Sequence, residues 1–131
     1  ALVSGYSSAA LSERIYSNEN MCGLLIFTGA ADKEGSLGGL VEQGGMDKFI
    51  PLLTKALENG LTCTTDPECF MKNPTSERLN GAACHSCTMI SETACECGNR
   101  LLDRVFVVPT PEHEEMAYFR GLVNDLCGIQ I

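Results

Sequence analysis

A group of closely spaced cysteines in its second half constrains this chain more than any other sequence feature. Within the segment Asn80–Cys87, two residues separate Cys84 from Cys87, and Cys95 follows shortly afterwards. Two intervening residues allow a tight loop in which both thiolates face one tetrahedral metal ion, and Cys95 can approach from the start of the next element. This spacing predicts a structural zinc site.

The fourth ligand is expected from the upstream pair Cys63 and Cys69. Between them, the turn-forming dipeptide Asp66-Pro67 can direct either cysteine towards the downstream loop. We favour Cys69, because it is the nearer in sequence, and keep Cys63 as the alternative. The expected ligands are Cys69, Cys84, Cys87 and Cys95. A mononuclear site of four thiolates without ferredoxin spacing favours Zn²⁺ over iron.

Two other uses of cysteine compete with the zinc site. The even number of eight cysteines suits a disulfide framework, but a chain of 131 residues that is 44% hydrophobic can build a core without bridges. The second alternative is a thiol-based redox enzyme or sensor that uses Cys84 and Cys87. We rank it below zinc, because the pair does not follow a clear strand in a βαβ pattern and has further cysteines nearby.

Length and charge limit the remaining classes of function. A single domain, residues 1–131, is expected at this length, and no apolar run approaches the roughly 20 residues that cross a bilayer. The formal net charge of −8 produces a field that repels phosphate, so autonomous non-specific binding to nucleic acid is not expected. With no visible secretory signal either, we expect a soluble, cytoplasmic protein without a membrane partner.

Hydrophobic patterns predict a mixed α and β fold in which several helices pack on a small sheet. Helices are predicted at Ser7–Tyr16, through Leu37–Val41, at Met46–Asn59, at Glu92–Leu102 and from Pro111 to Gly128. Buried strands are predicted at Leu24–Thr28 and Arg104–Val108. The glycine-rich stretch 29–45 is expected to form a close-packed turn, with an anion cradle of backbone N–H groups as the alternative.

No residue pattern supports catalysis. The two histidines, His85 and His113, lie outside any recognisable triad sequence. A catalytic zinc normally keeps an open coordination position, whereas four thiolates close the shell. We therefore expect a structural metal in a chain that is not itself an enzyme.

Six short motifs occur in order along the chain. They are Gly-Leu-Leu-Ile-Phe-Thr-Gly at 23–29, Glu-Gly-Ser-Leu-Gly-Gly-Leu-Val at 34–41, Asp-Pro-Glu-Cys at 66–69, Gly-Ala-Ala-Cys-His-Ser-Cys at 81–87, Glu-Thr-Ala-Cys-Glu at 92–96 and Asn-Arg-Leu-Leu-Asp-Arg at 99–104. Together they resemble the MrfA-type zinc-binding domain found at the C-terminus of superfamily 2 DNA helicases and their relatives. The likeness is greatest to the helicase-associated B components of DISARM antiphage systems.

This resemblance implies the C-terminal module of a larger helicase-associated protein, with a four-cysteine zinc site and no chemistry of its own. Cys84, Cys87 and Cys95 match the family pattern directly, whereas both Cys69 and Cys63 fit its Asp-Pro-x-Cys element. The implied partners are a helicase body or partner subunit, and DNA through the parent protein, in DNA repair or antiphage defence. The candidate DNA contacts are Arg78, Arg100 and Arg104.

Overall fold

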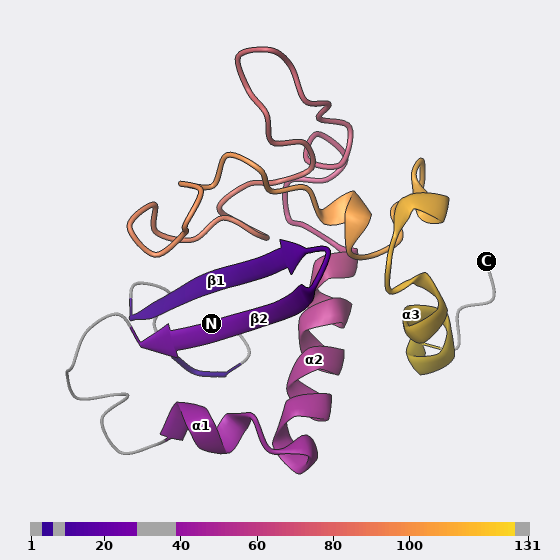
Figure 1. Cartoon of the computed structure of the whole chain (residues 1–131). Coiled ribbons are helices and arrows are strands. Elements are labelled where there is room, and N and C mark those ends of the chain that lie inside the picture. The colour runs from indigo at the N-terminus through magenta and orange to yellow at the C-terminus, as the bar shows by residue number, and fades with distance from the viewer. Residues whose placement is uncertain (1–3, 7–9, 29–38, 128–131) are drawn as a thin grey trace.

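The computed structural model describes residues 4–6, 10–28 and 39–127 of the chain, which form a mixed α and β structure (Figure 1). The elements, with η marking 3₁₀ helices, are β1 (Leu11–Asn18), β2 (Met21–Thr28), α1 (Gly39–Gln43), α2 (Met46–Leu61), η1 (Arg104–Phe106), η2 (Glu114–Met116) and α3 (Arg120–Cys127). Residues 62–103, here called the cysteine arm, consist of turns and irregular backbone. The predicted mixed α and β fold is confirmed, although the sheet of the described residues has only two strands.

β1 and β2 form an antiparallel hairpin. Their register runs from Leu11 opposite Thr28 to Asn18 opposite Met21. The Asn18 side-chain oxygen accepts a hydrogen bond of 3.0 Å from the backbone N–H of Asn20, which closes the turn. The predicted strand at 24–28 is confirmed as part of β2.

The predicted helix at Ser7–Tyr16 is wrong over its described part, because residues from Leu11 onwards form β1. The evidence for the helix was that Leu11 and Ile15 are four residues apart and so share a face. Residues four apart also share a face in a strand, so this spacing does not distinguish the two structures. Residues 7–9 of the predicted helix lie outside the described residues.

The expectation that the second strand is buried is also wrong. Although β2 is apolar along almost its whole length, its side chains are exposed on both faces of the hairpin. The large apolar residues of the hairpin that are between 41% and 67% exposed are Ile15, Met21, Leu24, Leu25, Ile26 and Phe27.

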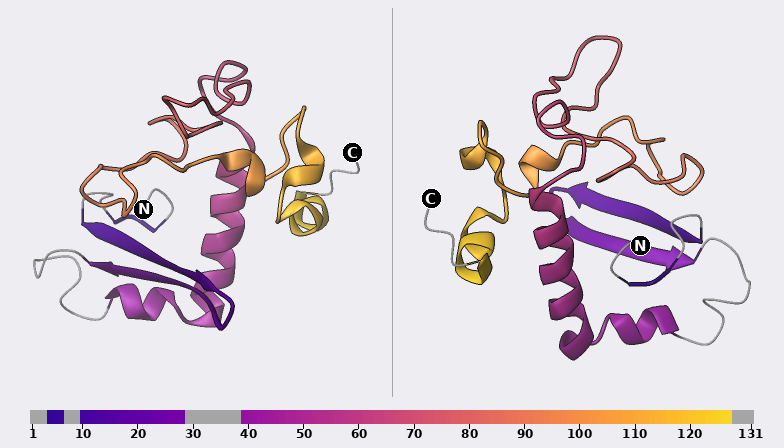
Figure 2. Two further views of the ribbon diagram at one scale, coloured as in Figure 1. Left: turned by 45° about the horizontal axis from the view of Figure 1, so that its top comes forward. Right: turned by 180° about the vertical axis from the view of Figure 1, so that it is seen from behind.

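The helix predicted at Met46–Asn59 is confirmed as α2 and continues to Leu61. Its apolar stripe reaches a small core in which Leu57, Val108 and Val123 are buried. Leu53, Leu61 and Phe119 pack against this core. α3 lies beside α2, and the cysteine arm continues from the C-terminal end of α2 (Figure 2). The core therefore joins α2, α3 and the turn that follows η1.

The short helical turn predicted through Leu37–Val41 overlaps α1, which begins at Gly39. Residues 29–38, which include most of the alternative anion cradle, lie outside the described part of the chain. None of the helices in the described residues is both long and apolar enough to cross a membrane.

The strand predicted at Arg104–Val108 is wrong, because these residues form η1 and a following turn. The Asp103 carboxylate accepts a hydrogen bond of 3.2 Å from the N–H of Val105 and caps the turn. The N–H groups of Val107 and Val108 then donate to the carbonyl of Arg104 at 2.9 and 3.0 Å. The β-branched composition is used here to fill the core rather than to pair with another strand.

The helix predicted at Glu92–Leu102 is replaced by a series of turns. Gly98 and Asn99 both have positive φ angles, 55° and 60°, which interrupt a right-handed helix. The Asn99 side chain donates to the carbonyl of Ile90 at 2.7 Å and accepts from its N–H at 3.2 Å. Two side-chain hydrogen bonds thus close this part of the arm into a compact loop.

The single helix predicted from Pro111 is divided into η2 and α3. Between them, the N–H groups of Tyr118 and Phe119 donate to the carbonyls of Phe106 and Val107 at 3.0 and 3.1 Å. These donors are therefore not free for a continuous helix. The pairing instead places Phe119 against the core.

Candidate metal centre

Four cysteine side chains meet where the cysteine arm leaves α2. The sulfur atoms of Cys63, Cys69, Cys84 and Cys87 all lie within 4.8 Å of one another. Individual Sγ–Sγ distances are 3.4 Å for Cys63 and Cys84, 3.7 Å for Cys69 and Cys87, and 3.7 Å for Cys84 and Cys87. Cys69 is buried, and the other three are half-buried.

These distances suit a tetrahedral zinc ion. Zn–S bonds of about 2.3 Å in a tetrahedron place the sulfur atoms about 3.8 Å apart, close to the observed separations of 3.4–3.7 Å. A disulfide requires an S–S distance of about 2.05 Å. All seven cysteines with described side chains are free. The geometry is therefore that of a metal centre rather than of paired disulfides.

The Cys84–Cys87 loop is shaped by backbone hydrogen bonds to one carbonyl. The N–H groups of Cys87 and Thr88 donate to the carbonyl of Cys84 at 3.1 and 3.2 Å. The N–H of Cys84 in turn approaches the Cys87 sulfur at 3.4 Å, in the N–H···S arrangement that stabilises a thiolate. Two residues between the cysteines are enough to make this loop, as the sequence predicted.

The Cys63–Cys69 turn supplies the other pair. The N–H of Asp66 donates to the carbonyl of Cys63 at 3.0 Å, and the N–H of Cys69 donates to that of Thr65 at 3.0 Å. The Asp66 carboxylate also accepts from the N–H of Cys63 at 2.8 Å. This turn brings Cys63 and Cys69 to the same side, so both join the cluster, whereas the sequence analysis treated them as alternatives.

The local environment separates the acidities of two cluster thiols. Burial raises the pKa of Cys84, but hydrogen bonds with Thr65 and Cys63 outweigh it and lower this pKa to about 6. Burial, followed by hydrogen bonding to Cys87, raises the pKa of Cys69 well above that of an ordinary thiol. The thiol of Cys84 thus ionises at lower pH than that of Cys69, and a bound dication would supply charge that favours ionisation of Cys69.

Cys95, an expected ligand, lies outside the four-cysteine group. It sits beside the hairpin, in a recess shared with Ser12 and Phe27. Its neighbour Glu96 forms an ion pair of 3.2 Å with Arg14 and donates its backbone N–H to Glu13 at 3.1 Å. The turns that replace the predicted helix at 92–102 therefore direct this cysteine towards β1.

The three candidate DNA contacts differ in accessibility. Arg78 and Arg100 are exposed, and one Arg78 nitrogen donates to the carbonyl of Asn73 at 3.3 Å. Arg104 is only 1% exposed and forms an ion pair with Asp66. Its side chain is therefore almost wholly withdrawn from solvent, unlike those of Arg78 and Arg100.

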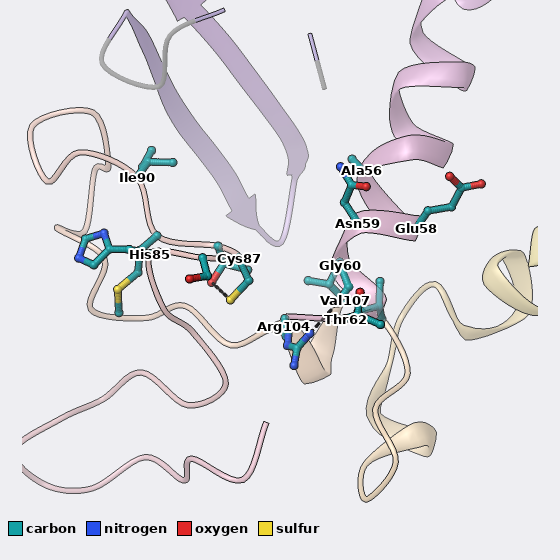
Figure 3. A pocket seen from close by; sticks show the side chains of 14 residues that line it. Ala56, Glu58, Asn59, Gly60, Thr62, His85, Cys87, Ile90, Arg104 and Val107 are labelled. Atoms are coloured by element: carbon teal, nitrogen blue, oxygen red, sulfur yellow. Dashed lines mark hydrogen bonds between the residues drawn. The ribbon is translucent and has the colours of Figure 1, made fainter. Parts of the chain in front are cut away.

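A pocket of about 600 Å³ lies between the C-terminal end of α2 and the Cys84–Cys87 loop (Figure 3). Its lining includes Gly60 of α2, His85 and Cys87 of the loop, and Arg104. Figure 3 shows these residues around one recess, with Arg104 beside Gly60. The recess places a cationic side chain next to the metal centre.

Comparison with known proteins identifies the family. A model of the MrfA Zn-binding domain matches residues 1–88. This chain belongs to that family. The DISARM protein DrmB of Bacillus paralicheniformis is 51% identical to it over 124 residues, which make up 94% of this chain and 22% of the relative. The chain thus spans about a fifth of the length of this curated relative.

Family membership and geometry agree on the cofactor. The cluster provides four cysteines able to hold a zinc ion in a member of a zinc-binding family, which confirms the predicted Zn²⁺. The region matched by the family model contains Cys63, Cys69, Cys84 and Cys87 and ends before Cys95. The recognition of an MrfA-type domain related to a DISARM component is also confirmed.

Proposed function

We propose that this chain is a structural zinc-binding module of a helicase-associated protein related to the DISARM component DrmB. In this proposal Zn²⁺ is held by Cys63, Cys69, Cys84 and Cys87, and Cys95 is not a ligand. The observation that carries it is the convergence of four thiols from two separate loops to within 4.8 Å. Four thiolates complete a tetrahedral shell, which leaves no position for a substrate or a reactive water.

Zinc would act here by joining two separate segments of the cysteine arm. The Cys63–Cys69 turn follows α2, and the Cys84–Cys87 loop lies farther along the arm. A metal bound between them makes its binding free energy part of the folding free energy, on the order of 10 kcal/mol in small zinc domains. The module would therefore be a rigid, metal-dependent element without catalytic activity.

Metal analysis tests this proposal. Protein purified without added metal should contain one zinc per chain by elemental mass spectrometry, and chelation should lower its thermal unfolding temperature. A protein that lacks metal and unfolds at the same temperature with and without chelator would contradict the structural zinc role. Cys97→Ser provides a control, because Cys97 is exposed and outside the cluster.

We further propose that the hairpin docks the module onto the remainder of its parent polypeptide. Continuous apolar strands are typical of sheet positions covered on both faces, yet the apolar residues of β2 are exposed here. By contrast, β1 carries polar side chains and the Arg14–Glu96 ion pair, as edge strands do. A single polypeptide more than four times as long as this chain, as DrmB is, would have ample chain to cover β2.

Cys22 offers a direct probe of this docking. It is exposed on β2 and lies on the same hairpin face as Leu24 and, across the strands, Ile15. In the full-length parent, Cys22 should react with a maleimide at least about tenfold more slowly than in this chain, whereas exposed Cys97 should react similarly in both. Equal Cys22 rates in the two proteins would contradict docking at this face.

A role in positioning DNA within the parent protein is proposed for Arg78 and Arg100, which are exposed. The net charge of −8 requires such contacts to be local. Separate Arg78→Ala and Arg100→Ala changes in the full protein should weaken DNA binding and reduce its salt dependence. Unchanged affinity for both variants would remove DNA from the proposal and leave a partner subunit or helicase body as the contact.

A thiol redox function at Cys84 and Cys87 is the second candidate. It is favoured by their Sγ separation of 3.7 Å and by the lowered pKa of Cys84. Reversible oxidation of these two thiols without loss of metal would support it. We favour zinc, because two further thiols complete the cluster, and we place the module in the cytoplasm, where thiols stay reduced.

A further inference from the structure

Arg104 is a buried, charged residue beside the metal centre. Its side chain is only 1% exposed, and a buried guanidinium is stable only when it is paired and hydrogen-bonded. One side-chain nitrogen donates to the carbonyl of Gly60 at 3.1 Å, and another contacts the Asp66 carboxylate. The backbone N–H of Arg104 donates to the carbonyl of Ala82 at 3.1 Å.

These contacts connect Arg104 to both halves of the cysteine cluster. Asp66 lies in the Cys63–Cys69 turn, and its second carboxylate oxygen accepts the N–H of Cys63 at 2.8 Å. Ala82 lies just before the Cys84–Cys87 loop. One residue thus links the end of α2, the first ligand turn and the segment that leads to the second.

Arg104 is paired with Asp66, and its charge also acts on the cysteine cluster. Four thiolates and one Zn²⁺ carry a net charge of −2, whereas Asp66 supplies a single negative charge to Arg104. Arg104 also interacts electrostatically with Cys69 and Cys87. A cation between Asp66 and the cluster can therefore offset part of the excess negative charge of a bound zinc centre.

One donor of this guanidinium is also without a partner. Among the described residues, the buried Nε–H of Arg104 has no hydrogen-bond acceptor. A buried donor left unsatisfied is destabilising, because it has lost its hydrogen bonds to water without replacement. A metal-bound thiolate is a strong acceptor, so Nε–H would gain a partner if zinc binding draws one of the cluster sulfurs within its reach.

We propose that Arg104 is the outer cation of the zinc centre, where it offsets the charge of the metal-bound thiolates and offers Nε–H to the sulfur of Cys69 or Cys87. This inference rests on the four-cysteine site proposed above. It assigns Arg104 a positioning and charge-balancing role in place of DNA contact. Because a charge-compensated thiolate is less nucleophilic, Arg104 should slow both zinc loss and alkylation of the ligand cysteines.

Three variants of this chain separate charge from packing. Arg104→Met removes the cation and leaves Asp66 unpaired, Arg104→Met with Asp66→Asn removes both charges, and Arg104→Lys keeps a cation without the planar fork. Arg100→Met is the matched control, because Arg100 is exposed. Circular dichroism of each zinc-loaded variant identifies those that keep the native secondary structure.

The readouts are zinc transfer to a chromophoric chelator and the thiolate-to-metal charge-transfer bands of the Co²⁺-loaded protein. Loss of an outer-shell partner typically weakens metal sites about 10–100-fold, so both Met variants should release zinc about 10–100-fold faster than wild type. Arg104→Lys should recover part of this difference. The Co²⁺ bands should shift in the Arg104 variants and stay unchanged in Arg100→Met.

The outcomes distinguish this inference from the site on which it rests. Folded Arg104 variants with wild-type zinc release and wild-type Co²⁺ bands would overturn the role of Arg104. So would an Arg104→Lys variant that is as impaired as Arg104→Met with unshifted bands, since that pattern indicates packing alone. Wild-type protein that lacks a four-thiolate Co²⁺ spectrum would instead refute the proposed ligand set.

Discussion

The cysteine arm and the β1–β2 hairpin combine regular backbone structure and side-chain burial in opposite ways. The arm is irregular throughout, yet it buries Cys69, Ala82, Ala83 and Ala94, together with the polar Asn80 and Asn99. The hairpin has a complete antiparallel ladder but leaves most of its large apolar side chains exposed. An irregular segment can therefore be the better-packed one when side-chain hydrogen bonds and a metal centre replace backbone pairing.

The stability of the two regions should therefore depend on different partners. The arm brings four of its cysteines together and directs its buried polar groups inwards, so its stability should depend on zinc. The hairpin directs its apolar groups outwards, and a two-stranded ribbon is marginally stable without packing on one face. Its stability should depend on what covers it.

Zinc removal should have the largest effect, and it should affect the cysteine arm far more than the hairpin. The N–H groups of Cys87 and Thr88 donate within the ligand loop. Chelation should raise their amide hydrogen-exchange rates on the order of a thousandfold or more. The amides paired between β1 and β2 should change far less. Hydrogen exchange followed by mass spectrometry would measure both regions, and equal loss of protection in each would contradict a locally acting metal.

The next largest effect should come from matched leucine truncations. Leu57 is buried in the core of α2, whereas Leu24 is 62% exposed on β2. Leu57→Ala should lower the free energy of unfolding by about 2–5 kcal/mol, and Leu24→Ala by less than about 0.5 kcal/mol. Urea denaturation of zinc-loaded protein measures both, and comparable losses would mean that the hairpin is already covered within this chain.

One glycine in the arm and one in the hairpin should also respond differently to substitution. A Cβ added at Gly81 would clash with the carboxylate of Asp103, which accepts the N–H of Ala82 at 3.1 Å. A Cβ added at Gly23 of β2 meets no atom within 4 Å. Gly81→Ala should therefore destabilise the protein by about 1–3 kcal/mol, whereas Gly23→Ala should be near neutral in thermal unfolding. A neutral Gly81→Ala would show that the arm is loosely packed there.

The smallest predicted difference concerns two asparagines. Asn99→Ala removes both hydrogen bonds to Ile90 and puts alanine, which tolerates the left-handed region less well than asparagine, at a φ of 60°; this should cost about 1–2 kcal/mol. Asn18→Ala removes one exposed turn bond and should cost about 0.5 kcal/mol or less. Thermal unfolding of the two variants side by side tests this order, and the reverse order would contradict it.

The sequence predicted those parts of the structure that local pattern determines. α2 follows from an apolar stripe of helical period, and the Cys84–Cys87 loop follows from its two-residue spacing. The turn between Cys63 and Cys69 was also predicted, from Asp66 and its following proline. In each case the residues that decide the conformation lie within a few positions of one another.

The failures depend on contacts that are distant in sequence or on single backbone angles. The turn at Gly98 and Asn99 was not recognised, so a helix was expected to bring Cys95 to the cluster. Similarly, the ion pair between Arg104 and Asp66 joins residues far apart in the chain, so Arg104 was expected on a strand and at a DNA surface. The signal for Cys63 was available, because the same turn that directs Cys69 also directs its partner.

The most direct test of the four-cysteine centre compares zinc content in Cys63→Ser and Cys95→Ser, each purified beside the wild type without added metal. Cys95→Ser should keep one zinc per chain and a four-thiolate Co²⁺ spectrum, because Cys95 lies outside the cluster. Cys63→Ser should bind zinc at least about 100-fold more weakly, because its three remaining thiolates leave the shell open. Full zinc in Cys63→Ser together with its loss from Cys95→Ser would contradict the proposed centre.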